Sequence, residues 1–304
     1  RLSYRAIIIF KIKTYLKVFV FKVKMKKSVK TLSFPVRGKY VVMLAPSFVV
    51  DFSYPEIILK LRRLGFDKVV ELTFGAKLVN REYHKLLKKC PSGCLMISSV
   101  CPGVVSLINN KFSKLKKNLI LIDSPMVAMA KVCKKIYPKH NVVFISPCEF
   151  KKQEAEGCKE IDFVINFNEL KEIFAKKLFK REDKNLSTSF DRFYNDYTKI
   201  YPLAGGLSKT AHLKNILTNK ESISIDGIKR VETFLKKGNF GKLKFLDVNF
   251  CVGGCVGGPY INSSVPLVVK KLKVRGYLRK SKQEDIPEIK KGLVKKAKGI
   301  SLKK

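Results

Sequence analysis

Four of the eight cysteines in this sequence have a similar placement, because each lies within a few residues of the end of a short apolar run. These are Cys101, Cys148, Cys251 and Cys255. Four thiolates are what a cubane 4Fe-4S cluster requires, and the softness of sulfur restricts the competitors mainly to zinc and copper(I). The set therefore predicts a metal centre, with a 4Fe-4S cluster as its favoured occupant.

Glycines and prolines surround these cysteines. Gly253 and Gly254 lie between the last two thiols, and they lack the Cβ atoms that would keep the backbone away from a bulky inorganic core. We therefore predict that both glycines bind the cofactor. Pro102 and Pro147 can set turns beside the other two cysteines. The alternative is that the four cysteines are small buried apolar side chains, which their shared placement at strand-to-loop junctions disfavours.

The other cysteines favour simpler interpretations. Cys133 lies in an amphipathic stretch and is expected in the core, and Cys158 lies in a polar loop. Cys90 and Cys94 have the spacing of a metal pair. Cys94 and Cys101, however, would lie about 23 Å apart along an extended strand at about 3.3 Å per residue. We therefore predict that Cys90 and Cys94 have no role in the centre.

The elements that must position the thiols follow an alternating pattern. From residue 39 onward, short apolar runs alternate with segments of helical periodicity, which is typical of βαβ units and a parallel sheet. Strands are expected at 39–44, 68–72, 95–99, 119–122, 142–145, 163–167 and 244–250, and helices at 55–64, 104–115, 126–137, 168–178 (capped by Asn168) and 227–237. Ligands collect beyond the carboxyl ends of strands in such sheets, so the four thiols could converge in one crevice.

The predicted fold class is therefore α/β, with two lobes of mostly parallel sheet flanked by helices and the cluster site in the cleft between them. The cluster-binding domain is expected at residues 39–262, with lobes at about 39–180 and 181–262. Residues 1–38 form a separate N-terminal segment, and residues 263–304 form a basic, helix-prone C-terminal tail.

The charge of the chain would by itself suggest nucleic acid as a partner. The 304 residues carry a net charge of +39, but arginine accounts for only 11 of the 63 basic residues, and the lysines are scattered. Proteins that read phosphates and bases favour the planar fork of arginine. We therefore do not expect nucleic acid to be the main partner. A basic nucleic-acid-binding protein with structural cysteines remains an alternative.

Cysteine usage and hydropathy bear on location. Eight cysteines in 304 residues are too sparse for a secreted disulfide framework, so we expect a reducing, cytoplasmic location. The apolar stretch Ala6–Val20 is interrupted by Lys11, Lys13 and Lys17, and it falls short of the roughly 20 apolar residues of a membrane span. We predict a soluble protein without membrane association. Because the chain does not begin with Met, we also expect a fragment or a processed product.

The cysteine segments resemble the signature motifs of one protein family, the C-terminal domain of the iron-only hydrogenase large subunit. The resemblance runs from about Val41 to Tyr260 and includes Leu64–Val69 and Ser124–Met126. It implies a two-lobed α/β domain that holds the H-cluster, which is a 4Fe-4S cubane joined through one cysteine to a di-iron unit. That unit carries carbonyl, cyanide and a bridging dithiolate, and maturation enzymes would have to load it.

The resemblance also implies roles for individual residues. The four cysteines would ligate the cubane, and Cys255 would be shared with the di-iron unit. Lys151 matches the lysine that holds a cyanide ligand, and Glu154 matches the acidic end of the same motif. An ammonium beside a cyanide makes a charge-assisted hydrogen bond. Lys151 and Glu154 are therefore the candidate catalytic residues.

Two departures from the family pattern predict altered function. Val100 stands where catalytic members have a cysteine that relays protons to the distal iron, so fast turnover should suffer. Ser146 and Asn249 replace two methionines that flank the cluster. A single cysteine before Pro102 resembles the sensory branch of the family, in which the domain reports dihydrogen or redox state to a partner.

The N-terminal segment resembles a ferredoxin module that has lost its ligands. The corresponding positions are Ile9, Ile12, Tyr15 and Phe19, none of which is a thiol. Residues 1–38 are therefore expected to be a degenerate ferredoxin remnant, with electrons entering from an external carrier. The predicted function is a hydrogenase-like iron-sulfur redox protein with a sensory or slow dihydrogen-handling role. The alternative is a 4Fe-4S-only electron-transfer or structural protein.

Overall fold

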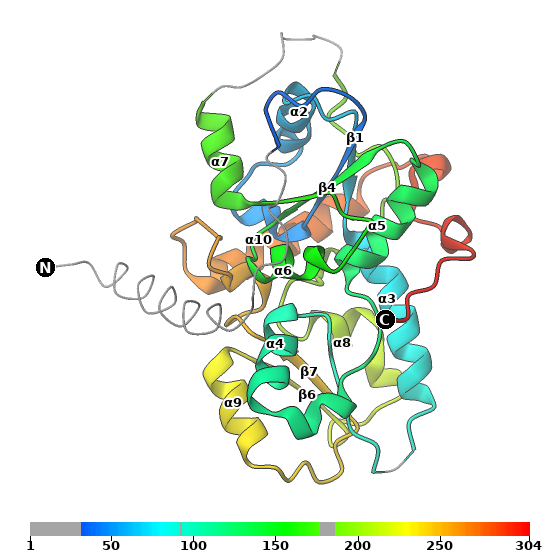
Figure 1. Ribbon diagram of the computed structural model, residues 1–304, viewed down its shortest axis with the longest axis vertical. Coiled ribbons are helices and arrows are strands. Elements are labelled where there is room, and N and C mark those ends of the chain that lie inside the picture. The colour runs from blue at the N-terminus through cyan, green and yellow to red at the C-terminus, as the bar shows by residue number, and fades with distance from the viewer. Residues whose placement is uncertain (1–31, 92, 177–185) are drawn as a thin grey trace, which may run out of the picture. The chain divides into compact units, whose positions relative to one another are not determined.

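A computed structural model of the chain describes residues 32–91, 93–176 and 186–304. Residues Ser33–Lys304 form one compact unit that contains two parallel sheets (Figure 1). The expected ferredoxin remnant lies almost wholly outside the described residues. Within the described residues, no helix is both long enough and apolar enough to cross a membrane.

The first sheet has four strands in the order β2-β1-β4-β5, and all neighbours are parallel. The strands are β1 (Tyr40–Leu44), β2 (Lys68–Glu71), β4 (Asn141–Ser146) and β5 (Phe163–Asn166). Residues 41–44 of β1 are completely buried. A continuous buried apolar run of this kind is typical of a central parallel strand that is covered by helices on both faces.

The second sheet has the order β3-β7-β6 and is also parallel. Its strands are β3 (Met96–Ile97), β6 (Ser222–Asp226) and β7 (Phe245–Asn249). Because β3 pairs with β7, the lobe boundary expected at residue 180 does not separate the two sheets. Strand β6 was not predicted, although its sequence Ser-Ile-Ser-Ile-Asp alternates as an edge strand does.

The strand expected at residues 119–122 does not form a regular strand in the described structure. Residues 119–122 make only isolated bridges, between Ile97 and Leu119 and between Ile122 and Lys303. The segment pairs with β3 on one side and with the C-terminal residues on the other, but each pairing is a single bridge and forms no continuous ladder. The prediction of a regular strand at 119–122 was therefore wrong.

Helices cover the sheets. They are α2 (Glu56–Arg63), α3 (Thr73–Lys88), α4 (Pro102–Lys111), α5 (Pro125–Ile136), α6 (Phe150–Glu156), α7 (Phe167–Ala175), α8 (Gly206–Thr210), α9 (Ile228–Lys236) and α10 (Leu267–Lys282). Helix α3, which was not predicted, packs against α5. The two backbones can approach closely because residue 75 is a glycine. A Cβ at this position would lie only 2.5 Å from the Pro125 carbonyl oxygen.

The start of α7 corrects the predicted cap. The side chain of Asn166, not that of Asn168, accepts a hydrogen bond from the Glu169 N–H at 2.9 Å, and Glu169 accepts from the Asn166 N–H at 2.8 Å. This reciprocal pair is a capping box. Asn166 is the cap because it is the last residue with extended backbone geometry, and Asn168 already lies within the helix.

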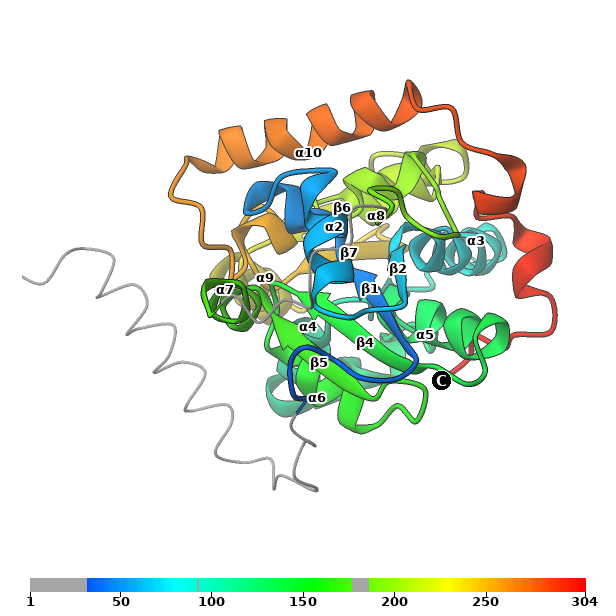
Figure 2. The same ribbon diagram turned by 90° about the horizontal axis from the view of Figure 1, so that it is seen from above.

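The C-terminal residues belong to the compact unit. Helix α10 lies across one face of it (Figure 2), where it packs against two short 3-10 helices, η1 (Pro46–Val50) and η3 (Tyr197–Ile200). Val274 and Tyr277 face inward and are buried. Near the end of the chain, the Leu302 carbonyl accepts from the Asp123 N–H at 2.8 Å. The segment predicted as a basic tail therefore contributes to the core.

A fully buried ion pair joins three of these elements. Lys199 in η3 donates to Glu71 at the end of β2 at 2.6 Å, and both side chains have no exposed surface. The hydroxyl of Tyr277 in α10 donates to the other Glu71 oxygen at 2.7 Å. The Lys199 ammonium also lies 4.2 Å from the ring centroid of Tyr277 and 4.5 Å from that of Tyr194. The pair therefore links the first sheet to α10.

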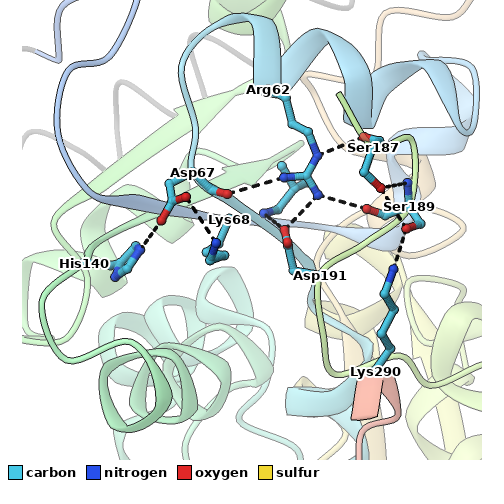
Figure 3. A network of polar contacts seen from close by, with 9 residues as sticks. Arg62, Asp67, Lys68, His140, Ser187, Ser189, Asp191 and Lys290 are labelled. Atoms are coloured by element: carbon cyan, nitrogen blue, oxygen red, sulfur yellow. Dashed lines mark hydrogen bonds and ion pairs between the residues drawn. The ribbon is translucent and has the colours of Figure 1, made fainter. Parts of the chain in front are cut away.

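A second polar network attaches the segment that follows residue 185 to the first sheet (Figure 3). One oxygen of Asp191 accepts from the Arg62 guanidinium at 2.9 Å and from the Val69 backbone N–H at 2.7 Å. Arg62 also donates to the Ser187 and Ser189 carbonyls. One carboxylate thus satisfies both a side chain of α2 and the backbone of the edge strand β2.

Asp191→Ala should therefore lower the free energy of unfolding by about 1.5–3 kcal/mol, because it removes charge-assisted hydrogen bonds and leaves two donors without their acceptor. Urea unfolding followed by circular dichroism measures the change. The matched control is Asp67→Ala in the same figure. Asp67 pairs with His140 and Lys68, but its side chain is 41% exposed, so a loss of about 0.2–1 kcal/mol is expected. Equal losses for the two variants would contradict this interpretation.

The turn before β6 carries a pH-dependent contact. Hydrogen bonds from Lys244 and from the Thr218 backbone and hydroxyl lower the pKa of Glu221 to about 2. Since the folded-state pKa lies below the usual value, the contact stabilises the fold above that value and is lost as the pH falls toward 2. NMR titration of Glu221 should show the lowered pKa. Thr218→Val, which removes the hydroxyl donor, should raise it, and an unchanged pKa in that variant would contradict the assignment.

Candidate metal centre

The four predicted cysteines all follow the carboxyl ends of parallel strands. Cys101 follows β3 and caps α4, and Cys148 lies between β4 and α6. Cys251 follows β7, and Cys255 begins the short 3-10 helix η5 (Cys255–Gly257). One thiol therefore comes from the first sheet and three come from the second.

The pKa values of three of these thiols are raised by burial and by the charges of the other thiols. Burial raises the pKa of Cys148, and charges at Cys101 and Cys255 raise it further. Burial also raises the pKa of Cys251 far above its usual value, and the charges of the other three thiols add to this effect. The pKa of Cys255 is raised to about 11 by burial and by Cys101. Because such effects fall off with distance, the four thiols lie within electrostatic range of one another.

This group is not arranged around a single point. In the part of the chain that the structure describes, no three His, Cys, Asp or Glu side chains could hold one metal ion. The ligands of a single tetrahedral zinc ion, at about 2.3 Å from the metal, would have to lie about 3.8 Å apart. A cubane makes a different demand, because each of its four thiolates binds a different iron.

The remaining cysteines stay outside this group. Cys90 and Cys94, predicted to have no role in the centre, are joined by a disulfide bond. Cys133 is completely buried in the hydrophobic core around α5, which confirms its predicted position. Cys158, expected in a polar loop, is also buried, and its thiol donates to Glu160 at 3.3 Å.

Gly253 and Gly254 have positive φ angles of 83° and 84°. A Cβ at Gly253 would lie 2.5 Å from the side chain of Leu267 in α10, and a Cβ at Gly254 would lie 2.7 Å from the Ala204 nitrogen. Glycine is therefore required at both positions by backbone conformation and by contacts within the protein. Their predicted contact with a cofactor remains a prediction.

The segment 202–204 runs alongside the cysteine loop. The Cys255 N–H donates to the Pro202 carbonyl at 2.7 Å, and the Ala204 N–H donates to the Gly253 carbonyl at 3.1 Å. Leu203 and Gly254 form an antiparallel bridge between these two bonds. The missing Cβ at Gly254 allows this approach, which fixes the loop that carries Cys255.

Lys151 and Glu154 lie beside the thiols and bond to each other. The Lys151 ammonium donates to Glu154 at 2.5 Å and to the Ser124 hydroxyl at 3.0 Å, and the Lys151 backbone N–H bonds to the Cys148 sulfur. Burial lowers the pKa of Lys151, but Glu154 and the charges of Cys148 and Cys101 outweigh it and raise the pKa. Lys151 therefore remains a cation next to the thiols.

Sequence reasoning missed two buried hydroxyls near this loop. Ser47 is completely buried in η1, which follows β1 and packs against η5, and Tyr201 directly precedes the segment 202–204. Within the described residues, neither hydroxyl has a hydrogen-bond partner. Because buried polar groups are normally paired, both hydroxyls fit a centre that binds a further group. Ser47 has the strand-end position that also marks the cysteines, whereas Tyr201 has no local sequence signal.

Comparison with known proteins assigns the chain to a family. The sequence matches the family described as "Iron only hydrogenase large subunit, C-terminal domain" over residues 38–259. The chain belongs to this family. The expected membership is thereby confirmed, and with it the hydrogenase-like, iron-sulfur class of the protein. Its assignment to the single-Cys-Pro sensory branch remains a prediction.

Two curated relatives are hydrogenases. The chain is 29% identical over 287 residues to "Iron hydrogenase 1" of Clostridium pasteurianum, covering 76% of this chain and 50% of the relative. It is 25% identical over 279 residues to "NADP-reducing hydrogenase subunit HndD" of Solidesulfovibrio fructosivorans, covering 70% of this chain and 47% of that relative. The chain thus spans about half the length of the curated relatives it matches.

Solved structures confirm the fold. The [FeFe]-hydrogenase HydA(deltaEFG), whose report concerns stepwise H-cluster assembly, aligns with a TM-score of 0.58 at 17% identity, over 92% of this chain and 90% of that one. A variant of [FeFe]-hydrogenase HydA1 from Chlamydomonas reinhardtii aligns with a TM-score of 0.57 at 16% identity, over 93% and 90%. The predicted α/β class, with parallel sheets flanked by helices, is therefore correct.

Proposed function

We propose that this chain is a hydrogenase-like iron-sulfur redox protein that binds a 4Fe-4S cluster through Cys101, Cys148, Cys251 and Cys255. The observation that supports this most directly is the placement of the four free thiols, each just after the carboxyl end of a parallel strand. When bound, such a cluster supplies one-electron redox chemistry. Gly253 and Gly254 would bring the backbone of the cysteine loop close to it.

Residues of this chain would offset the negative charge of four thiolates. The Lys151 ammonium is the nearby cation, and its backbone N–H donates to the Cys148 sulfur. Burying thiolates without such partners would be costly. Glu154 and Ser124 hold the ammonium in place through two of its three N–H groups, so one N–H remains available for a bound group.

We further propose a sensory or slow dihydrogen-handling role if a di-iron unit completes an H-cluster. Val100 precedes Cys101, is only 8% exposed and packs in the hydrophobic core. Because its side chain is a hydrocarbon, it cannot donate or accept a proton. Lys151 and Glu154 would then face the ligands of that unit. The second candidate is a 4Fe-4S-only electron carrier or structural protein. It requires no ligand of a di-iron unit at Lys151, because the ammonium already pairs with Glu154.

Anaerobic reconstitution with iron and sulfide tests the proposal. We expect a brown protein with about four irons per chain and the magnetic resonance signal of a reduced 4Fe-4S cluster. A colourless product would overturn the proposal. Infrared bands of carbonyl and cyanide, in protein made alongside hydrogenase maturation enzymes, would separate the two candidates: their presence supports an H-cluster, and their absence supports the 4Fe-4S-only protein.

The proposed function carries expectations about partners and location. We infer an external electron carrier or signalling partner and a cytoplasmic location, which suits free thiolates. Nucleic acid would bind at most through the charge of +39. Such binding should weaken steeply with salt and show no sequence preference.

A further inference from the structure

Tyr201 carries a buried hydroxyl that the function described so far does not use. Within the described residues its oxygen is buried and has no hydrogen-bond partner. An unpaired buried hydroxyl lowers the folded-to-unfolded ratio by a factor of about 5 to 30. The structure thus contains a donor that lacks an acceptor, which is the feature expected where a bound group supplies the acceptor.

The position of Tyr201 points to the cysteine loop. The next three residues pair with Gly253, Gly254 and Cys255 through the hydrogen bonds described above. The Tyr201 hydroxyl lies within electrostatic range of Tyr83, Asp247 and Cys255, in decreasing order of effect. Burial and these charges raise the pKa of Tyr201 well above its usual value, so the hydroxyl keeps its proton and can act as a donor.

The Tyr83 hydroxyl and the Asp247 carboxylate form hydrogen bonds with groups other than Tyr201. The Tyr83 hydroxyl pairs with the Ser99 hydroxyl at 3.2 Å and accepts from the Ser99 N–H at 3.0 Å. Asp247 accepts from the Ser208 N–H at 3.0 Å and from the Ser208 hydroxyl at 2.7 Å. In the described structure neither forms a bond to Tyr201, and the segment that follows Tyr201 pairs with the cysteine loop, so this loop is where we place the missing acceptor.

We infer that the Tyr201 hydroxyl donates a hydrogen bond to the cluster bound at Cys255, either to a cluster sulfide or to the Cys255 sulfur. This inference rests on the proposed function and assigns Tyr201 the role of tuning the cluster. A hydrogen bond to sulfur stabilises the more negative, reduced state, so Tyr201 makes the cluster easier to reduce.

Tyr201→Phe tests the inference in two states of the protein. In the cluster-free protein the variant should be more stable, because it loses an unpaired buried hydroxyl. In the reconstituted protein the reduced-to-oxidised ratio at a fixed potential should fall about tenfold, which is 59 mV for a one-electron couple. A redox titration followed by electron paramagnetic resonance measures this shift, and urea unfolding measures the stability.

Tyr83→Phe is the matched control. It removes a hydroxyl from another buried tyrosine, but from one that is hydrogen-bonded to Ser99. This variant should be less stable without the cluster and should leave the reduction equilibrium unchanged. A Tyr201→Phe protein that loads its cluster with an unchanged potential overturns the inference, and so does an equal shift in both variants. A wild-type protein that loads no cluster overturns the proposed function instead.

Discussion

Lys199→Met should lower the free energy of unfolding of the cluster-free protein by about 3–5 kcal/mol, because it breaks a fully buried ion pair and leaves one charge uncompensated. Glu71 and Lys199 have no exposed side-chain surface, and the pair is 2.6 Å apart. The remaining donors to Glu71, Tyr277 and Thr73, are neutral hydroxyls and cannot balance its charge. The Lys199 contacts with the rings of Tyr194 and Tyr277 are lost as well.

Urea unfolding compares this variant with Lys85→Met, its matched control. Lys85 also pairs with a glutamate, Glu82 at 2.8 Å, but its side chain is 58% exposed, so the expected loss is about 0.2–1 kcal/mol. The double variant Glu71→Leu/Lys199→Met should be more stable than Lys199→Met alone, since no charge is left buried. A double variant that is less stable than the single one would show that the pair does more than balance charge.

Cys148→Ser should reduce the iron bound after reconstitution from about four atoms per chain to less than one, because the cubane loses the only ligand that the first sheet supplies. A serine oxygen is a harder ligand than a thiolate and does not replace it for iron-sulfur clusters. Iron analysis together with the visible absorption of the cluster measures the loss. Folding of the variant is checked by circular dichroism, since Cys148 is part of a buried site.

Cys158→Ser controls for the loss of a buried thiol as such. Cys158 is 9% exposed and lies outside the group of four thiols, with Glu160 as its partner. This variant should keep about four irons per chain and the wild-type absorption. Full iron binding by Cys148→Ser would remove Cys148 from the ligand set. Loss of iron in both variants would mean that binding depends on overall stability and not on the particular ligands.

Local sequence signals were sufficient to predict the central strands of both sheets. The apolar runs at β1, β4 and β7 were placed correctly, because each strand is buried along most of its length and is followed by turn residues. The same placement rule picked out all four grouped cysteines. It also applies to Ser47, which follows β1, but a serine is too common at strand ends to attract notice without the structure.

The remaining features depend on contacts between distant residues. The pairing of Met96 with Phe245 has no signature at either position, so the sequence did not indicate that β3 and β7 share a sheet. Helix α3 starts without a side-chain cap, which explains why no start signal was found. Tyr201 is placed beside the cysteine loop by the pairing of residues 202–204 with residues 253–255, which no local pattern predicts.

The β3–β7 pairing has a consequence for biosynthesis. While the ribosome is still translating the middle of the message, the nascent chain contains Cys101 and Cys148 but neither Cys251 nor Cys255. The partner of β3 is also missing at that stage, so the second sheet cannot yet form. Iron delivered to such an unfinished polypeptide would meet only two of the four proposed ligands. Metal insertion is therefore expected to follow synthesis of the segment that carries Cys251 and Cys255, when all four sulfurs are present.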